Sequence, residues 1–257
     1  MDANPWNPIP GSIILPMPAR FFAPDLIGLD QPVALPSDEA AHLVRVLRLC
    51  SGEIVAVFDG RGAEYLARVE TAEPRRVVVR PFESVNPPPE PKVALTVAQG
   101  LLKGRKFDAV VRDLTMVGAV AVQPLVTDHS EARERDPERW MRVAVASAKQ
   151  CRRAVVPLVR FPVSFHQLVD KDDAPLRLLL VEPEVAESSD SLGRLRNGPT
   201  PSAATLAVGP EGGWSTEEVT RACAAGFVPV TIGRRTLRAD AVVVCAVSVL
   251  LFLWGDL

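Results

Sequence analysis

The stretch Leu206-Ala-Val-Gly-Pro-Glu-Gly-Gly-Trp-Ser215 joins an apolar run to a glycine-rich turn and a helix start. Ser215 with Glu218 three residues later is typical of a capping box, and Gly226 suits the left-handed position that ends a helix. A second apolar run ends in another glycine turn, Ile232-Gly-Arg-Arg-Thr-Leu-Arg238. The order strand, glycine loop, helix, strand, glycine loop, helix therefore decides the fold of this region.

The first glycine loop does not have the form of a phosphate-binding loop. Gly209-Pro-Glu-Gly-Gly213 lacks the Lys-Ser/Thr ending of a P-loop and the Gly-x-Gly-x-x-Gly spacing of a dinucleotide site. Glu211 would repel a phosphate. A ligand with a cationic or neutral centre fits better, and S-adenosylmethionine has a sulfonium cation, an adenine edge and no phosphate. The alternative is a tight turn without a ligand, but two such loops in one unit favour a site.

The two loops resemble the signature of a known family. Val208-Gly-Pro-Glu-Gly-Gly-Trp-Ser-x-x-Glu218, Gly226-Phe227 and residues 232–240 are similar to the 16S ribosomal RNA uridine-N3 methyltransferases (RsmE type) of the SPOUT class. The resemblance covers about residues 19–254. Upstream segments in the same order are His42-Leu-Val-Arg-Val-Leu-Arg48, Val57-Phe-Asp-Gly60, Leu101-Leu-Lys-Gly-Arg-Lys106, Gln123-Pro-Leu125 and Ala148-Lys-Gln-Cys-Arg-Arg153.

This resemblance implies an α/β fold with two domains. Residues 92–257 would be a SPOUT trefoil-knot methyltransferase domain with a mostly parallel sheet, in which the knot folds both glycine loops around S-adenosylmethionine. Residues 19–85 would be a small PUA-like β-barrel that binds RNA. Family members pair through knot helices, so a homodimer acting on 16S ribosomal RNA or the small ribosomal subunit is expected.

The residue pattern supports the same division. Short apolar runs separated by turns occupy residues 19–85, which is typical of a small barrel. One helix is expected over residues 37–48, with Ser37 as its cap. Its apolar stripe would consist of Leu43, Val46 and Leu47. Residues 1–18 are expected to be a disordered extension.

Asn86-Pro-Pro-Pro-Glu-Pro91 is expected to be a stiff linker, because proline cannot continue a helix or a central strand. Strands then alternate with helices, which predicts a mostly parallel sheet. Strands are expected at residues 92–98, 121–127, 176–182 and 227–232, and helices at 106–117, 137–149 and 241–254. Pro229 is expected near a bend or in the first turn of its strand.

Composition narrows the class of protein. Four cysteines, at positions 50, 151, 223 and 245, have no paired spacing, which argues against zinc and disulfides and fits a reducing cytoplasm. The histidines at 42, 129 and 166 are also scattered, and His129 and His166 are interpreted as surface or packing residues. Residues 241–254 would span only about 21 Å, too little for a membrane, and are interpreted as a buried or interface helix.

Charge places the RNA contacts in the middle of the chain. Residues 19–85 hold 8 Arg and 10 Asp or Glu, a net charge of −2, whereas residues 100–160 hold 12 Lys or Arg and 7 Asp or Glu, a net of +5. Such basic residues can contact phosphates, although some will only form a solvated helix face. The candidates for RNA binding are Arg20, Arg45, Arg48, Lys103, Lys106, Arg152 and Arg153.

Methylation of uridine N3 requires a donor for charge developing on the uracil and an acceptor for the N3 proton. Arg238 is the candidate donor, because its guanidinium is always charged and follows the second loop. Asp240 is the candidate acceptor, and Glu211 is either a second candidate or a carboxylate that braces the loop. The resemblance implies that the cofactor contacts Leu180, Glu182, Val208, Gly209, Pro210, Glu211, Gly212, Gly213, Ile232, Gly233, Arg235, Leu237 and Arg238.

The chain departs from the family pattern at four positions, which are Asp113, Met116, Asp240 and Ala241. Asp240 is one methylene shorter than the usual glutamate, and Ala241 lacks the usual threonine hydroxyl. These differences leave open a slower enzyme and two alternative functions. One is a SPOUT methyltransferase for another RNA, and the other is a non-catalytic RNA-binding or ribosome-assembly protein.

Overall fold

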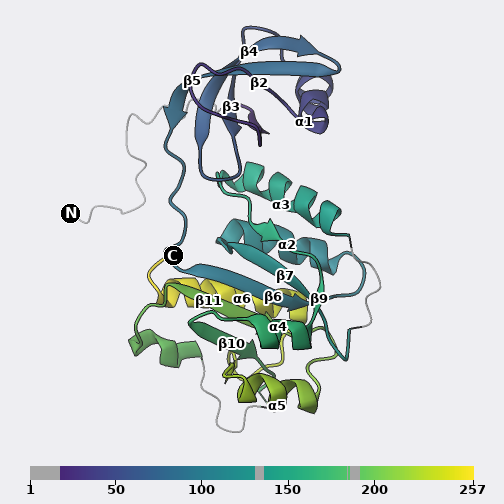
Figure 1. Cartoon of the computed structure of the whole chain (residues 1–257), viewed down its shortest axis with the longest axis vertical. Helices are drawn as coiled ribbons and strands as arrows, with labels where there is room; N and C mark the ends of the chain where they lie inside the picture. The colour runs from purple at the N-terminus through teal and green to yellow at the C-terminus, as the bar shows by residue number, and fades with distance from the viewer. Residues whose placement is uncertain (1–17, 131–135, 184, 186–191) are drawn as a thin grey trace, which may run out of the picture. The chain divides into compact units, whose positions relative to one another are not determined.

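A computed structural model describes residues 18–130, 136–183, 185 and 192–257 of the chain (Figure 1). Two compact units are present. The first combines the residues up to Asp59 with Glu64–Val85, and the second combines Gly60–Ala63 with Asn86–Leu257. The expected N-terminal extension lies, apart from Pro18, outside the described residues.

The first unit is a five-stranded sheet in the order β1-β3-β4-β5-β2. Its strands are β1 (Arg20–Phe22), β2 (Val33–Ala34), β3 (Ile54–Phe58), β4 (Glu64–Glu73) and β5 (Arg76–Val85). The β1–β3 pair is parallel and the other pairs are antiparallel. Phe21, Leu43, Val55 and Val79 fill its core. Strand β1 was not anticipated from the sequence, because three residues carry too little alternation to read.

The helix of the first unit differs from the prediction in its detail. Helix α1 (Ser37–Ala41) continues as a π-helix at His42–Leu47. Pro36 is the N-cap and no side chain caps the helix, so the prediction that Ser37 is the cap was wrong. Of the predicted apolar stripe only Leu43 is buried, whereas Val46 is 64% exposed and Leu47 41% exposed. The wider π turn changes the angle between successive side chains, so a stripe read at 3.6 residues per turn fails here.

The second unit contains a parallel sheet in the order β12-β10-β11-β6-β7-β8, with β9 also paired to β7. All of these strand pairs are parallel, as predicted. The strands are β6 (Ala94–Gly100), β7 (Ala121–Val126), β8 (Leu158–Val159), β9 (Val163–Ser164), β10 (Leu176–Leu180), β11 (Ala203–Val208) and β12 (Val228–Val230). Pro229 is the middle residue of β12 rather than a residue at a bend, and β12 tolerates it because it is an edge strand.

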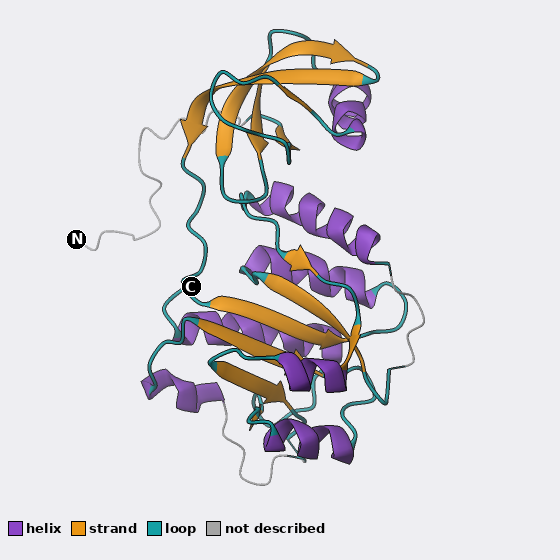
Figure 2. Cartoon of the chain, in the orientation of Figure 1, coloured by secondary structure: helices purple, strands orange, loops and turns teal. Residues whose placement is uncertain are grey.

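Helices cover both faces of this sheet (Figure 2). They are α2 (Lys106–Val117), α3 (Pro137–Cys151), α4 (Phe165–Lys171), α5 (Thr216–Ala224) and α6 (Ala239–Leu253), with a 3-10 helix at Leu192–Asn197. Alternate residues of a strand face opposite sides. Leu206 and Val208 therefore pack with α2 and α6, whereas Ala207 packs with α4 and α5. The short β8, β9 and α4 were not predicted.

Arg153 ties the start of the second unit to the end of α2. Its Nε donates to Glu90 Oε1 over 2.9 Å, and its Nη1 donates to the carbonyls of Thr115 and Ala119 over 3.0 and 2.8 Å. The side chain is only 7% exposed. Arg153 was predicted to contact RNA, but these bonds use its guanidinium inside the fold. The neighbouring Arg152 is exposed.

We expect Arg153→Met to lower the free energy of unfolding by about 3 kcal/mol, because Glu90 and buried carbonyls lose their partner. Urea denaturation followed by circular dichroism measures this. Arg152→Met is the matched control, since it removes an adjacent but exposed guanidinium. Equal losses in both variants would contradict the structural role of Arg153.

Candidate active site

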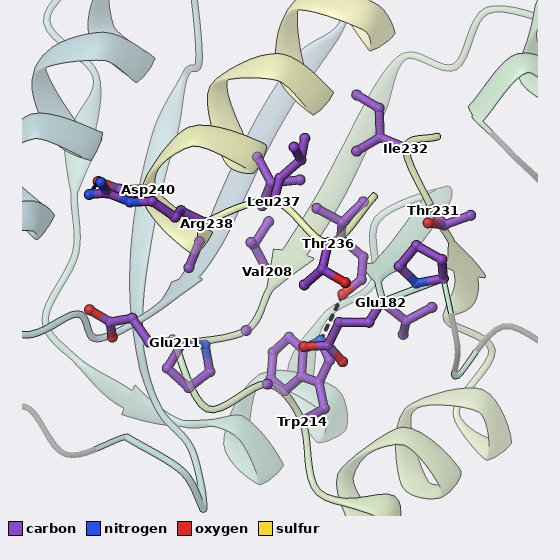
Figure 3. A pocket seen from close by; sticks show the side chains of 18 of the residues that line it. Glu182, Val208, Glu211, Trp214, Thr231, Ile232, Thr236, Leu237, Arg238 and Asp240 are labelled. Carbon is purple, nitrogen blue, oxygen red and sulfur yellow. Dashed lines mark hydrogen bonds and ion pairs between the residues drawn. The ribbon is translucent and has the colours of Figure 1, made fainter. Parts of the chain in front are cut away.

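A pocket of about 320 Å³ lies at the carboxyl ends of β10, β11 and β12 (Figure 3). Ligands of open parallel sheets bind at this end of the strands. The two glycine loops form its walls, and Leu180 at the end of β10 lies between them, because β10 separates β11 from β12 in the sheet. Apolar side chains that line the pocket include Leu180, Val208, Ile232, Leu237 and Val242.

Most residues that were predicted to bind a cofactor line this pocket. They are Leu180, Glu182, Val208, Gly209, Pro210, Glu211, Gly213, Ile232, Arg235, Leu237 and Arg238, and Asp240 joins them. Gly212 and Gly233 do not line it. A Cβ on Gly212 would meet His129, and Gly233 has no atom within 4 Å of that position. These two glycines therefore shape the loops and do not form the pocket wall.

Sequence reasoning missed several lining residues. They are Val181, Pro183, Trp214, Thr231, Thr236, Ala239 and Val242. Each lies within two positions of a predicted residue in the chain, so widening the predicted segments by two positions would have included them. Lys106 also lines the pocket, although it was assigned to RNA. It enters from the first turn of α2, and no local pattern indicates that approach.

The exit of the first loop is held by the predicted helix signals. Ser215 Oγ accepts from the Glu218 backbone N over 3.2 Å, and Glu218 Oε2 accepts from the Ser215 N over 3.0 Å, which confirms the capping box. Gly226 has φ of +88°, and Phe227 N donates to Ala222 O over 2.9 Å. This is the Schellman arrangement, so the predicted helix end is also confirmed.

The first loop contacts the ends of β6 and β10. The buried Gln99 Nε2 donates to Gly209 O over 3.0 Å. A Cβ on Gly100 would lie 2.6 Å from Pro210 N, so only glycine allows this approach. Trp214 Nε1 donates to Leu180 O over 2.8 Å, the dashed line in Figure 3. The loop that follows β11 is therefore held by two neighbouring strands, β6 and β10.

Gly213 brings the backbone close to a carboxylate. Its φ is +69°, a left-handed conformation, and a Cβ there would lie 2.7 Å from Glu182 Oε1. The left-handed backbone favours glycine at this position, and a Cβ would also have to displace the end of the Glu182 side chain. The close approach keeps Glu182 at the edge of the pocket, on the same side as Trp214 and Thr236 in Figure 3.

Two ion pairs occupy the other side of the pocket. Lys106 Nζ lies 2.8 Å from Glu211 Oε1, and Arg238 Nη2 lies 2.7 Å from Asp240 Oδ2. Burial alone would raise the pKa of Glu211, but the hydrogen bond from Lys106 and backbone N–H groups outweigh it and lower this pKa. Burial alone would also raise the pKa of Asp240, but the hydrogen bond and the charge of Arg238 outweigh it and lower this pKa. Both carboxylates are therefore ionised at neutral pH.

The second loop contrasts with the first. Residues 233–238 are all exposed, and the Arg238 side chain is 73% exposed. Arg238 still reaches Asp240 through two hydrogen bonds, from Nε over 3.1 Å and from Nη2 over 2.7 Å. The guanidinium is therefore oriented by Asp240 (Figure 3), while most of the Arg238 side chain is open to solvent.

The other predicted RNA contacts fall into two groups. Arg45, Arg48, Lys103 and Arg152 are exposed. Arg20 is not: its Nε and Nη2 donate to Glu64 over 2.9 and 2.8 Å, and its guanidinium lies 3.9 Å from the Phe58 ring centroid. The Arg20 guanidinium is therefore engaged by Glu64 and Phe58 within the first unit, and its role as an RNA contact stays a prediction.

The described part of the chain contains neither a group of metal ligands nor a helix that could cross a membrane. Among residues 18–130, 136–183 and 192–257, no three His, Cys, Asp or Glu side chains are grouped as metal ligands. None of the helices within those same ranges has the length and apolar character needed to cross a membrane.

Comparison with known proteins agrees with this geometry. A family model for the RNA methyltransferase domain matches residues 88–251, and a model for the RNA methyltransferase PUA domain matches residues 35–82. The ribosomal RNA small subunit methyltransferase E of Synechocystis is 34% identical over 219 residues, which cover 84% of this chain and 71% of the relative. The chain belongs to the ribosomal RNA small subunit methyltransferase E family.

Two solved structures have the same fold. The enzyme from Neisseria gonorrhoeae, bound to S-adenosyl methionine, is 29% identical with a TM-score of 0.83 and covers 93% of this chain and 98% of that one. A methyltransferase from Legionella pneumophila with bound SAM is 26% identical with a TM-score of 0.81, covering 93% and 97%. The expected S-adenosylmethionine cofactor and RNA methyltransferase class are therefore confirmed at the level of the family.

We expect Gly213→Ala to weaken S-adenosylmethionine binding at least tenfold, because Cβ must displace the Glu182 carboxylate as well as strain the backbone. Gly233→Ala is the control, since Gly233 has a similar φ of +71° but open space around it. Isothermal calorimetry measures both affinities. Equal effects would mean that backbone strain alone explains the glycine at 213.

We expect Lys106→Met to raise the pKa of Glu211, because burial remains while the lowering hydrogen bond and charge are lost. A carboxylate whose pKa is lower in the folded than in the unfolded state stabilises the fold at pH values above its unfolded pKa. This stabilisation is lost as the pH falls through the folded pKa. As the pH falls, Lys106→Met should therefore lose the stabilisation by Glu211 at a higher pH than the wild type does. Carbon-13 NMR titration of Glu211 measures it. Lys103→Met is the control, since Lys103 contacts Glu211 through its backbone N.

Proposed function

We propose that this chain methylates N3 of a uridine in 16S ribosomal RNA, with S-adenosylmethionine as methyl donor. The observation that carries the proposal is one pocket that joins both glycine loops, an apolar floor and the Arg238–Asp240 pair. The family membership supports the RNA class of the substrate, and the resemblance of the 232–240 segment supports uridine N3. The reaction would take place in the cytoplasm, where four free cysteines are stable.

The pocket suits the proposed cofactor chemically. Leu180, Val208 and Ile232 offer an apolar surface for a flat adenine ring. Glu182 and Glu211 are carboxylates that attract a cationic sulfonium or ammonium group and repel a phosphate. S-adenosylmethionine, when bound, supplies an electrophilic methyl group, so the protein has mainly to orient the reactants.

Arg238 is the proposed catalytic donor. Its exposed guanidinium, held by Asp240, can donate to the uracil oxygens as negative charge develops on them. Asp240 remains the nearest proton acceptor, but its lowered pKa makes it a weak base. We therefore assign to Asp240 first the orientation of Arg238 and only second the acceptance of the N3 proton. Glu211 is weakened as a base in the same way.

We further propose a trefoil knot and a homodimer. The resemblance supports the knot, and the exposed side of α6 supports a dimer. Ala241, Cys245 and Phe252 are exposed on this helix, and Phe252 is 67% exposed. Light scattering that shows a monomer at micromolar concentration would remove the dimer from the proposal.

The test uses the full chain, small ribosomal subunits that lack the modification, and labelled S-adenosylmethionine, followed by mass-spectrometric mapping of the methylated base. We expect Arg238→Met to lower kcat about 100-fold, as for loss of a charge-stabilising donor. Arg234→Met, at an exposed position outside the pocket lining, should retain activity.

The outcomes separate the alternatives. Label on another nucleotide or another RNA indicates a methyltransferase with a different substrate. RNA binding without cofactor affinity indicates a non-catalytic assembly protein. Cofactor binding without transfer to any RNA would contradict the proposed reaction.

A further inference from the structure

The turn that follows β7 contacts the first glycine loop on the side away from the pocket. His129 Nδ1 lies 2.9 Å from Gly212 O. Ser215 Oγ donates to Asp128 Oδ2 over 2.6 Å, and Asp128 N donates to Glu218 Oε1 over 3.1 Å. One short turn therefore reaches both the middle of the loop and the cap of α5.

This contact explains why position 212 is a glycine that does not line the pocket. A Cβ on Gly212 would lie 2.8 Å from the Cβ of His129, closer than real side chains approach. The histidine therefore packs directly on the loop backbone. Because Gly212 O can only accept, Nδ1 of His129 is the ring nitrogen that carries the proton in this bond.

The turn is itself well ordered by local bonds. Thr127 Oγ1 and Ser130 Oγ lie 2.8 Å apart, Thr127 N donates to Ser130 Oγ over 3.2 Å, and Ser130 N donates to Thr127 O over 3.1 Å. Thr127 is buried and directly follows β7. The turn thus extends the rigid sheet out to the loop.

We propose that His129 and Asp128 are positioning residues for the cofactor, an inference that rests on the proposed function. Gly209, Pro210, Glu211 and Gly213 face the pocket, while Gly212 faces the turn. The loop is therefore held between the turn and the ligand. His129 and Asp128 set the loop in its binding form before S-adenosylmethionine arrives, which lowers the entropic cost of binding.

The experiment compares full-length variants by calorimetry with S-adenosylmethionine and by steady-state kinetics. His129→Leu removes the donor, and we expect about a tenfold weaker cofactor affinity, the size of one net hydrogen bond. His129→Asn keeps a donor at a position like that of Nδ1 and should restore affinity to within about threefold of wild type. Asp128→Ala should weaken affinity like His129→Leu, through a separate contact.

A positioning role also predicts which kinetic constant changes. The KM for S-adenosylmethionine should rise in His129→Leu with little change in kcat, because neither residue touches the reacting atoms. A purely structural role would lower the melting temperature of His129→Leu without raising the KM for S-adenosylmethionine. His166→Leu on α4 is the control, since this exposed histidine does not line the pocket and its replacement should leave affinity unchanged.

The outcomes distinguish this inference from the function on which it rests. If the wild type binds S-adenosylmethionine and both His129→Leu and Asp128→Ala bind within twofold of it, the positioning role is overturned and the proposed function stands. If the wild type binds no cofactor, both are overturned. If leucine weakens binding and asparagine restores it, the hydrogen bond from position 129 is the cause.

Discussion

The hydrogen bond from the buried Gln99 side chain to Gly209 O is the contact on which the site depends. Its amide nitrogen also lies 3.1 Å from Gly100 O, so one side chain joins the ends of β6 and β11. The same first loop approaches β6 so closely that a Cβ on Gly100 would lie 2.6 Å from Pro210 N. The Gln99 amide and the glycine at position 100 therefore fix the position of this loop together.

The two loops have different mechanical roles. The first is held by Gln99, Trp214 and His129 from three directions, so its shape is set before a ligand binds. The second, residues 233–238, is exposed and carries the Arg238 guanidinium, which is the proposed donor to an RNA base. Because of this difference, the first loop can form a rigid wall for the cofactor, and the second can form an accessible wall for a large substrate. The ion pairs Lys106–Glu211 and Arg238–Asp240 are both partly exposed to solvent.

Sequence patterns succeeded where a local rule dominates. The α5 capping box and its Schellman end depend on neighbouring residues only, and α2 has the bounds that were expected. They failed where the surroundings of a side chain depend on a partner far away in the sequence. Arg153 and Arg20 have the sequence appearance of surface cations, but Glu90 and Glu64 bind them inside their units. The apolar stripe predicted for the 37–48 helix was wrong for a third reason. A π-helix at His42–Leu47 changes the number of residues per turn, and the prediction assumed an ordinary α-helix.

The sequence by itself determined the parallel α/β class, the two glycine loops, the cap of α5 and the family, because glycine, proline and capping residues act over a few positions. Only the tertiary structure decided which residues share the pocket. Lys106 enters it from α2, and His129 braces it from the turn after β7. These contacts join residues about a hundred positions apart, and their partners are set by the order of strands in the sheet, which no local pattern encodes.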